Sequence, residues 1–109
     1  MPRWLPRALK RIRSLAAAGR TEFTEKAIAE LADLRLGRED ATDVLAGLRP
    51  SDYATRLWSE PAAEWLYVFR PVLAGLRLYL KVAIREDCAV ISCHEDRAEQ
   101  AGEADDREH

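Results

Sequence analysis

Hydrophobic and polar residues alternate strictly from Leu76 to Arg85, near the C-terminal end of the chain. Leucine, valine and isoleucine occupy every second position, and the positions between them are mostly tyrosine and cations: Arg77, Tyr79, Lys81, Ala83 and Arg85. A period of two residues over this length is typical of a β-strand with one face in a core and the other in solvent. We therefore predict a strand over residues 76–85 whose outer face is basic.

Two further strands are predicted beside this one. The segment Glu64–Arg70 is rich in Trp, Tyr, Val and Phe, a composition typical of strands. Both of its faces are apolar, so the pattern leaves open which face is buried. Pro71 ends it, Val72–Gly75 is predicted as a loop, and Cys88–His94 is predicted as the last strand. Residues 54–63, which include a proline, are predicted as an irregular loop.

The first half of the chain shows a helical period instead. Leu5–Ala18 has apolar residues every three or four positions and is predicted as an amphipathic helix with basic residues on its surface. Glu25–Leu36 is predicted as a second helix capped by Thr24, and Glu39–Leu48 as a third. The basic surface of the first helix can contact RNA or an acidic protein, or can simply be solvated.

A register for the last two strands follows from the turn between them. Glu86 and Asp87 form the natural two-residue turn, although such turns usually contain glycine and a longer turn stays possible. This turn would pair Arg85 with Cys88. The register then places apolar pairs on one face and polar pairs on the other: Leu80–Cys93, Val82–Ile91 and Ile84–Ala89 against Tyr79–His94 and Lys81–Ser92.

The polar pairs suggest a chemistry. Directly opposed residues have Cβ atoms about 5 Å apart, so Tyr79 and His94 can act on one substrate group. Histidine exchanges protons near neutral pH, tyrosine is a second proton carrier, and the neighbouring Arg77 and Lys81 can hold phosphate oxygens. RNA cleavage needs a base for the ribose 2′-OH, an acid for the 5′-oxygen and cations at the phosphate. The alternative is an exposed cross-strand pair with no role.

Length and charge limit the partners. A chain of 109 residues is expected to form one domain, predicted over residues 1–95. Residues 96–109 carry six acids and two arginines, a net charge of −4, and are predicted to be a disordered tail. The whole chain has a net charge of −2, so the remainder carries −2 − (−4) = +2. A basic body suits a polyanionic partner.

Other classes of protein and site are not supported. No apolar run approaches the ~20 residues that cross a bilayer, and no signal peptide is recognised. Cys88 and Cys93 have odd spacing on one strand, so they are expected to face opposite sides and to stay unpaired in a reducing compartment such as a bacterial cytoplasm. No metal-ligand cluster, phosphate-binding glycine loop or cofactor motif is found.

Several motifs together resemble the MqsR family of bacterial type II toxins. They are Leu48–Tyr53 (L-x-x-S-D-Y), Trp65, Val68–Pro71 (a V-[YF]-R-P element) and Tyr79–Lys81, and the similarity extends over about residues 5–96. The resemblance implies an α+β fold in which two to three N-terminal helices pack on one face of a small twisted antiparallel β-sheet, as in RelE-like toxins. It also implies ribosome-independent cleavage of mRNA and neutralisation by a cognate antitoxin.

The resemblance also implies roles for individual residues. The catalytic tyrosine of the family matches Tyr79, and the lysine that the family has on the last strand is replaced by His94. Arg70 matches the arginine of the R-P element. The glutamine after the tryptophan falls on Leu66, and the lysine after the S-D-[FY] motif falls near Thr55. Arg56 is a possible substitute for that lysine.

The main hypothesis is therefore a metal-independent toxin endoribonuclease of the cytoplasm. Tyr79 and His94 would be its acid and base, in an order that the sequence leaves open. Arg56, Arg70 and Lys81 would bind or stabilise the phosphate. The second hypothesis is a catalytically degenerate module that binds RNA or the antitoxin, which the missing glutamine and lysine favour.

Overall fold

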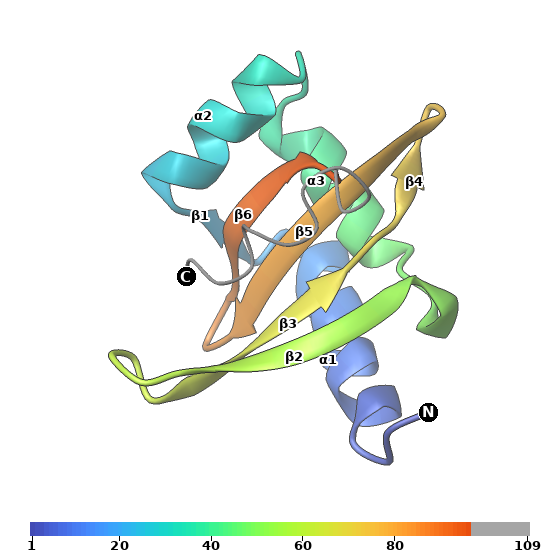
Figure 1. Ribbon diagram of the computed structural model, residues 1–109, viewed down its shortest axis with the longest axis vertical. Helices are drawn as coiled ribbons and strands as arrows, with labels where there is room; N and C mark the ends of the chain where they lie inside the picture. The colour runs from blue at the N-terminus through green and yellow to red at the C-terminus, as the bar shows by residue number, and fades with distance from the viewer. Residues whose placement is uncertain (97–109) are drawn as a thin grey trace.

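The computed structural model describes residues 1–96. Except for Asp96, the predicted disordered tail of residues 96–109 lies outside the described residues. The predicted α+β class is confirmed: three helices and a short 3₁₀ segment combine with a six-stranded sheet (Figure 1). The elements in chain order are α1 Leu5–Ala17, β1 Thr21–Phe23, α2 Glu25–Asp33, α3 Arg38–Ala46, η1 Pro50–Asp52, β2 Tyr53–Ser59, β3 Glu64–Phe69, β4 Val72–Leu73, β5 Leu76–Ile84 and β6 Cys88–Glu95.

The sheet is mixed, whereas the sequence predicted an antiparallel one. The strand order is β1-β6-β5-β3-β2, with β4 paired to β5, and β1 runs parallel to β6 while the other pairs are antiparallel. With only three residues, β1 is too short to show an alternating pattern. The predicted loop over residues 54–63 is also wrong in its first half, because β2 occupies residues 53–59 and forms the edge of the sheet.

The core lies between one face of the sheet and the helices α1 and α3, which cover that face in Figure 1. The apolar stripe predicted for α1 is buried, with Leu5, Leu9 and Ile12 at most 1% exposed. The helix ends at Ala17, and Gly19, just after the C-cap residue Ala18, has a φ of 75° that favours glycine. The facing sheet residues are Tyr67 and Phe69 on β3 and the apolar side chains of β5. The opposite face of the sheet is the open face.

The β5–β6 hairpin follows the predicted register only at its far end. The pairs Tyr79–His94, Leu80–Cys93 and Lys81–Ser92 are confirmed, but Ile84 pairs with Cys88 instead of Ala89. The loop therefore has three residues, 85–87. At Ile91 the strand β6 has one extra residue, a bulge, and beyond it the pairs again match the predicted register.

The extra residue corrects the prediction for the two cysteines. Beyond a bulge the alternation of faces shifts by one position, so odd spacing no longer means opposite faces. Cys88 and Cys93 are both buried in the same core cluster, at 0% and 1% exposure. Both are free thiols, in agreement with the prediction that they do not pair.

Candidate active site

Tyr79 and His94 are cross-strand neighbours on the open face of the sheet. Their rings stack with centroids 4.8 Å apart and planes inclined by 8°. The Lys81 ammonium nitrogen lies 5.9 Å from the centroid of the Tyr79 ring. The sequence-derived register thus correctly placed two proton-exchanging side chains and a cation together.

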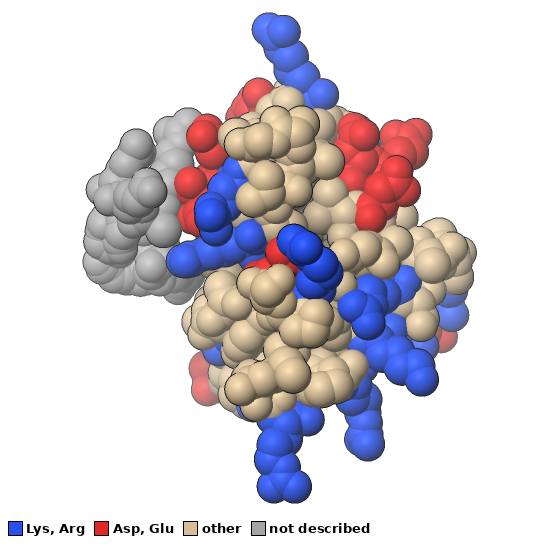
Figure 2. All heavy atoms as spheres, turned by 90° about the vertical axis from the view of Figure 1, so that its right-hand side faces the viewer, with Lys and Arg blue, Asp and Glu red and all other residues tan. Residues whose placement is uncertain are grey.

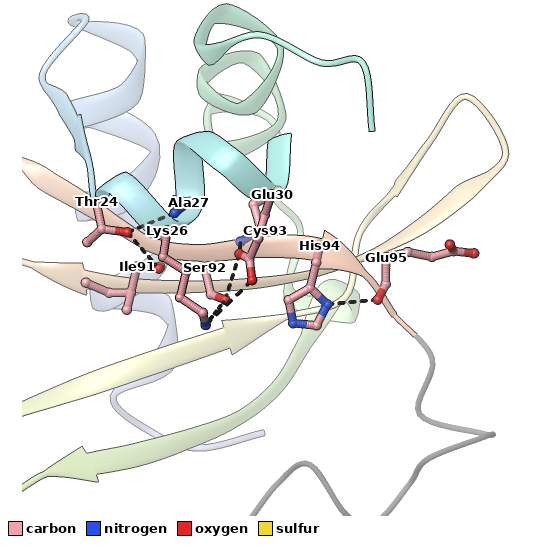
Figure 3. Close-up of polar contacts among 9 residues, drawn as sticks. All are labelled: Thr24, Lys26, Ala27, Glu30, Ile91, Ser92, Cys93, His94 and Glu95. Atoms are coloured by element: carbon pink, nitrogen blue, oxygen red, sulfur yellow. Dashed lines mark hydrogen bonds and ion pairs between the residues drawn. The ribbon is translucent and has the colours of Figure 1, made fainter. Parts of the chain in front are cut away.

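The ring of His94 is oriented by the backbone. Its Nδ1 lies 2.9 Å from the carbonyl oxygen of Glu95 (Figure 3). A carbonyl oxygen only accepts, so Nδ1 carries the proton in this hydrogen bond. In the neutral ring Nε2 then has the lone pair. This arrangement prepares Nε2 of His94 to accept a proton from a substrate.

Arg70 joins this group from the end of β3. Phe69 pairs with Leu80, so Arg70 follows at the level of Tyr79. The backbone N–H of Arg70 donates to the Asp52 carbonyl at 2.7 Å, which links the two motifs V-F-R-P and L-x-x-S-D-Y. Its Nε is 3.5 Å from Oδ2 of Asp96. Arg70 therefore adds a second cation beside the pair, one that it shares with a carboxylate.

Arg56 does not join the group. It pairs with Tyr67, whose side chain packs on the helix side of the sheet. Its guanidinium carbon lies 4.2 Å from the Trp4 ring centroid and 3.7 Å from that of Trp65. The sequence placed Arg56 with Tyr79 and His94, whereas the structure places it on the opposite side of the sheet.

The helix α2 borders the site along the edge of β6, where β1 ends (Figure 3). Oε1 of Glu30 accepts from the Cys93 N–H at 2.8 Å and from the Ser92 hydroxyl at 3.0 Å. Nζ of Lys26 donates to the same hydroxyl at 3.1 Å. Ser92 was expected on a solvated face, but α2 buries it completely. The sequence analysis missed Lys26 and Glu30, whose spacing of four on a predicted helix was their only signal.

The buried thiols are not suited to act as nucleophiles. Burial raises the pKa of Cys88 to about 12 and that of Cys93 to about 11, so both stay protonated at neutral pH. Among residues 1–96, no three His, Cys, Asp or Glu side chains are grouped so as to hold a metal ion. In the same part of the chain, no helix has the length and apolarity that a bilayer span requires.

Comparison with known proteins identifies the family. The family described as "Motility quorum-sensing regulator, toxin of MqsA" matches residues 6–95. The chain belongs to the MqsR toxin family. It is also similar to the mRNA interferase toxin MqsR of Escherichia coli (strain K12), with 28% identity over 88 residues that cover 80% of this chain and 90% of that protein. The resemblance predicted from the sequence motifs is confirmed.

The two positions at which this chain departs from the expected MqsR pattern lie on the open face. Thr55 pairs with Val68, which pairs with Lys81, and Leu66 pairs with Ala83, two residues along β5 from Lys81. Since Arg56 points to the helix side, it does not fill the place of a lysine at Thr55. The open face therefore carries a threonine and a leucine where the resemblance led us to expect a lysine and a glutamine.

Proposed function

We propose that this chain is the toxin of a type II toxin–antitoxin pair and an endoribonuclease that cleaves mRNA. Family membership supports the toxin class, and the name of the Escherichia coli relative supports mRNA as the substrate. The observation that carries the catalytic part is the stacked pair of Tyr79 and His94 on the open face, with Lys81 beside it. An mRNA substrate implies that this protein acts in the cytoplasm.

The proposed reaction is transesterification at a phosphodiester. Nε2 of His94 takes the proton of the ribose 2′-OH, and the 2′-oxygen attacks the phosphorus while the bond from phosphorus to the 5′-oxygen breaks. The hydroxyl of Tyr79 gives its proton to the departing 5′-oxygen. The products are a 2′,3′-cyclic phosphate and a 5′-hydroxyl end. Lys81 and Arg70 stabilise the charge that develops on the phosphate.

The hydrogen bond of Nδ1 to Glu95 supports this order of acid and base, which the sequence left open. No step of the proposed reaction uses a metal ion, so cleavage should persist in EDTA. The description "toxin of MqsA" supports a protein antitoxin as the partner. A second candidate function, a degenerate module that binds RNA or antitoxin without cleavage, is favoured by Leu66 and Thr55.

The substitution His94→Ala tests the proposal. Removal of a general base typically costs 10²- to 10⁴-fold in rate, so we expect cleavage and growth arrest to disappear while antitoxin binding persists. Tyr79→Phe should act in the same direction. His109→Ala, which removes the other histidine of the chain, is the matched control and should leave cleavage unchanged. Undiminished cleavage by the His94→Ala variant would refute the assignment, and binding without cleavage in the unsubstituted protein would favour the degenerate module.

A further inference from the structure

A groove runs between α1 and the helix-facing side of β3 and β5. It has a volume of about 920 Å³, and the side chains of Arg3, Arg7 and Arg11 line it together with Trp4 and Tyr67. Arg7 and Arg11 are four residues apart and lie one above the other on a single face of α1, and Arg3 precedes the first helical residue, Leu5. This groove is on the side of the sheet opposite to Tyr79 and His94.

Aromatic rings and a further cation lie beside the groove, on the β2–β3 hairpin. The guanidinium of Arg56 lies between the rings of Trp4 and Trp65, at 4.2 and 3.7 Å from their centroids. Trp65 packs edge-on against Trp58 with centroids 5.1 Å apart. These two indoles are 38% and 46% exposed. Large aromatic side chains are therefore accessible beside four arginines.

The arginines of the groove are not neutralised within the part of the chain that the structure describes. None of Arg3, Arg7, Arg11 and Arg56 takes part in an ion pair among residues 1–96. Like charges four residues apart destabilise a helix by a few tenths of a kcal/mol. The stripe therefore does not serve the stability of α1. Figure 2 shows basic side chains gathered toward the lower right of one face of the molecule, with acidic ones above them.

We propose that this groove binds a single-stranded flank of the RNA substrate. An acidic protein would be attracted by the same charges and can pack on exposed tryptophan, so it is the competing occupant that the experiment must distinguish. Single-stranded nucleic acid uses both features, since bases stack on aromatic rings and phosphates follow a basic groove. The inference rests on the proposed function for the identity of the RNA and assigns it a second contact, remote from the bond that is cleaved.

One RNA molecule can contact both the face with Tyr79 and His94 and the groove at α1, because the sheet has a free edge at β2. Only β3 and β2 separate β5, which carries Tyr79, from the free edge of the sheet. Neighbouring strands are about 4.8 Å apart, so this edge is roughly 10 Å from the strand that carries Tyr79. An RNA several nucleotides longer than the cleaved dinucleotide can pass around β2 into the groove. Affinity should therefore depend on the length of the flank.

The experiment uses the full chain with Arg7→Ala and Arg11→Ala combined. RNA binding is measured by fluorescence anisotropy in a His94→Ala background, and cleavage in the background with His94 intact. We expect roughly tenfold weaker binding of a long single-stranded RNA. The magnitude of the negative slope of log K against the logarithm of the salt concentration should decrease by about 1.4, because two phosphate contacts of about 0.7 each are lost. KM should rise for the long RNA, while kcat on a short RNA should not change.

Controls keep the outcomes distinct. Arg38→Ala removes an exposed arginine from the start of α3, outside the groove, and should leave RNA binding unchanged. The double variant should be at least as stable as the unsubstituted protein, because it relieves a like-charge pair. Unchanged RNA affinity would overturn the inference, and unchanged RNA affinity with weaker antitoxin binding would assign the groove to the protein partner. Weaker RNA binding by a protein that never cleaves RNA would support the groove and refute the proposed function.

Discussion

Replacing Glu30 by alanine should destabilise the fold through the edge of β6. Beyond Val90 this strand has no β1 residue to pair with. Side chains of α2 and of its N-cap residue form hydrogen bonds with the free backbone groups of β6 there. Thr24 donates its hydroxyl to the Ile91 carbonyl at 2.9 Å, and the Glu30 carboxylate accepts from the Cys93 N–H and the Ser92 hydroxyl. The Glu30→Ala substitution removes one acceptor that serves two buried donors.

The size of the effect follows from these contacts. Hydrogen bonds to a charged group contribute about 1.5–3 kcal/mol each. The Lys26 ammonium already contacts the Ser92 hydroxyl at 3.1 Å and partly compensates for the loss there. The Lys26–Glu30 ion pair itself adds little, since the lysine side chain is 63% exposed. We therefore expect a loss of about 3 kcal/mol, a large share of the roughly 5–15 kcal/mol typical of a domain.

Urea unfolding at neutral pH, followed by tryptophan fluorescence, measures this loss as a lower midpoint with an unchanged slope. Glu30→Gln keeps an acceptor oxygen without the charge and should lose about half as much. Glu25→Ala removes an exposed carboxylate from the first turn of the same helix and should cost less than about 1 kcal/mol. Equal midpoints for Glu30→Ala and Glu25→Ala would show that α2 does not hold the edge of β6 through this carboxylate.

Two further predictions concern titration. Burial raises the pKa of Cys88 from 9.0 to about 12, so its thiol stabilises the fold fully below pH 9 and loses this contribution as the pH rises toward 12. The urea midpoint should therefore fall less steeply with alkaline pH in Cys88→Ala than in the unsubstituted protein. Equal slopes of midpoint against pH would contradict this. The hydrogen bond from Arg85 lowers the pKa of Glu64 below 4.5, so their ion pair stabilises the fold above this pH and is lost as the pH falls through the lowered pKa. Glu64→Gln should therefore cost at most about 1 kcal/mol at neutral pH and nothing in strong acid. Urea midpoints of the two proteins at both pH values measure this difference.

The correct pairing of Tyr79 with His94 was predicted from a wrong turn. The real loop, residues 85–87, has one residue more than predicted, and this residue shifts the pairing by one position on the β5 side. The bulge at Ile91 shifts the pairing by one position on the β6 side. The two errors cancel beyond the bulge, so the far pairs agree and the near pairs do not. Periodicity alone does not locate a bulge, because one inserted residue in an apolar strand leaves apolar residues on both sides of it. This is why the site was predictable and the turn was not.

Two of the three strands that the sequence missed, β1 and β2, have a different cause; the third is the two-residue β4, in the predicted loop Val72–Gly75. In β1, three residues give no period, and this strand exists because β6 offers an edge beside it. In β2, the polar Thr55 and Ser59 and the exposed Leu57 and Trp58 hide the alternation. Edge strands are solvated on more sides than central ones, so their sequences carry less of the pattern that predicts strands. Tertiary pairing, which no local pattern records, determines both elements.

A second register shift decides the position of Arg56. Tyr53 pairs with Phe69, but Thr55 pairs with Val68, so β2 has one extra residue at Ala54. If the ladder continued regularly from the Tyr53–Phe69 pair, with no bulge, Arg56 would lie opposite Leu66, on the same face as Tyr79 and His94.

The extra residue instead turns the guanidinium of Arg56 to the helix side, between Trp4 and Trp65. Bulges are frequent next to active sites because they redirect side chains. Here the bulge in β2 moves a cation from the proposed cleavage face to the proposed RNA groove. The placement of Arg56 beside the groove, away from Tyr79 and His94, therefore depends on the register shift in the edge strand β2.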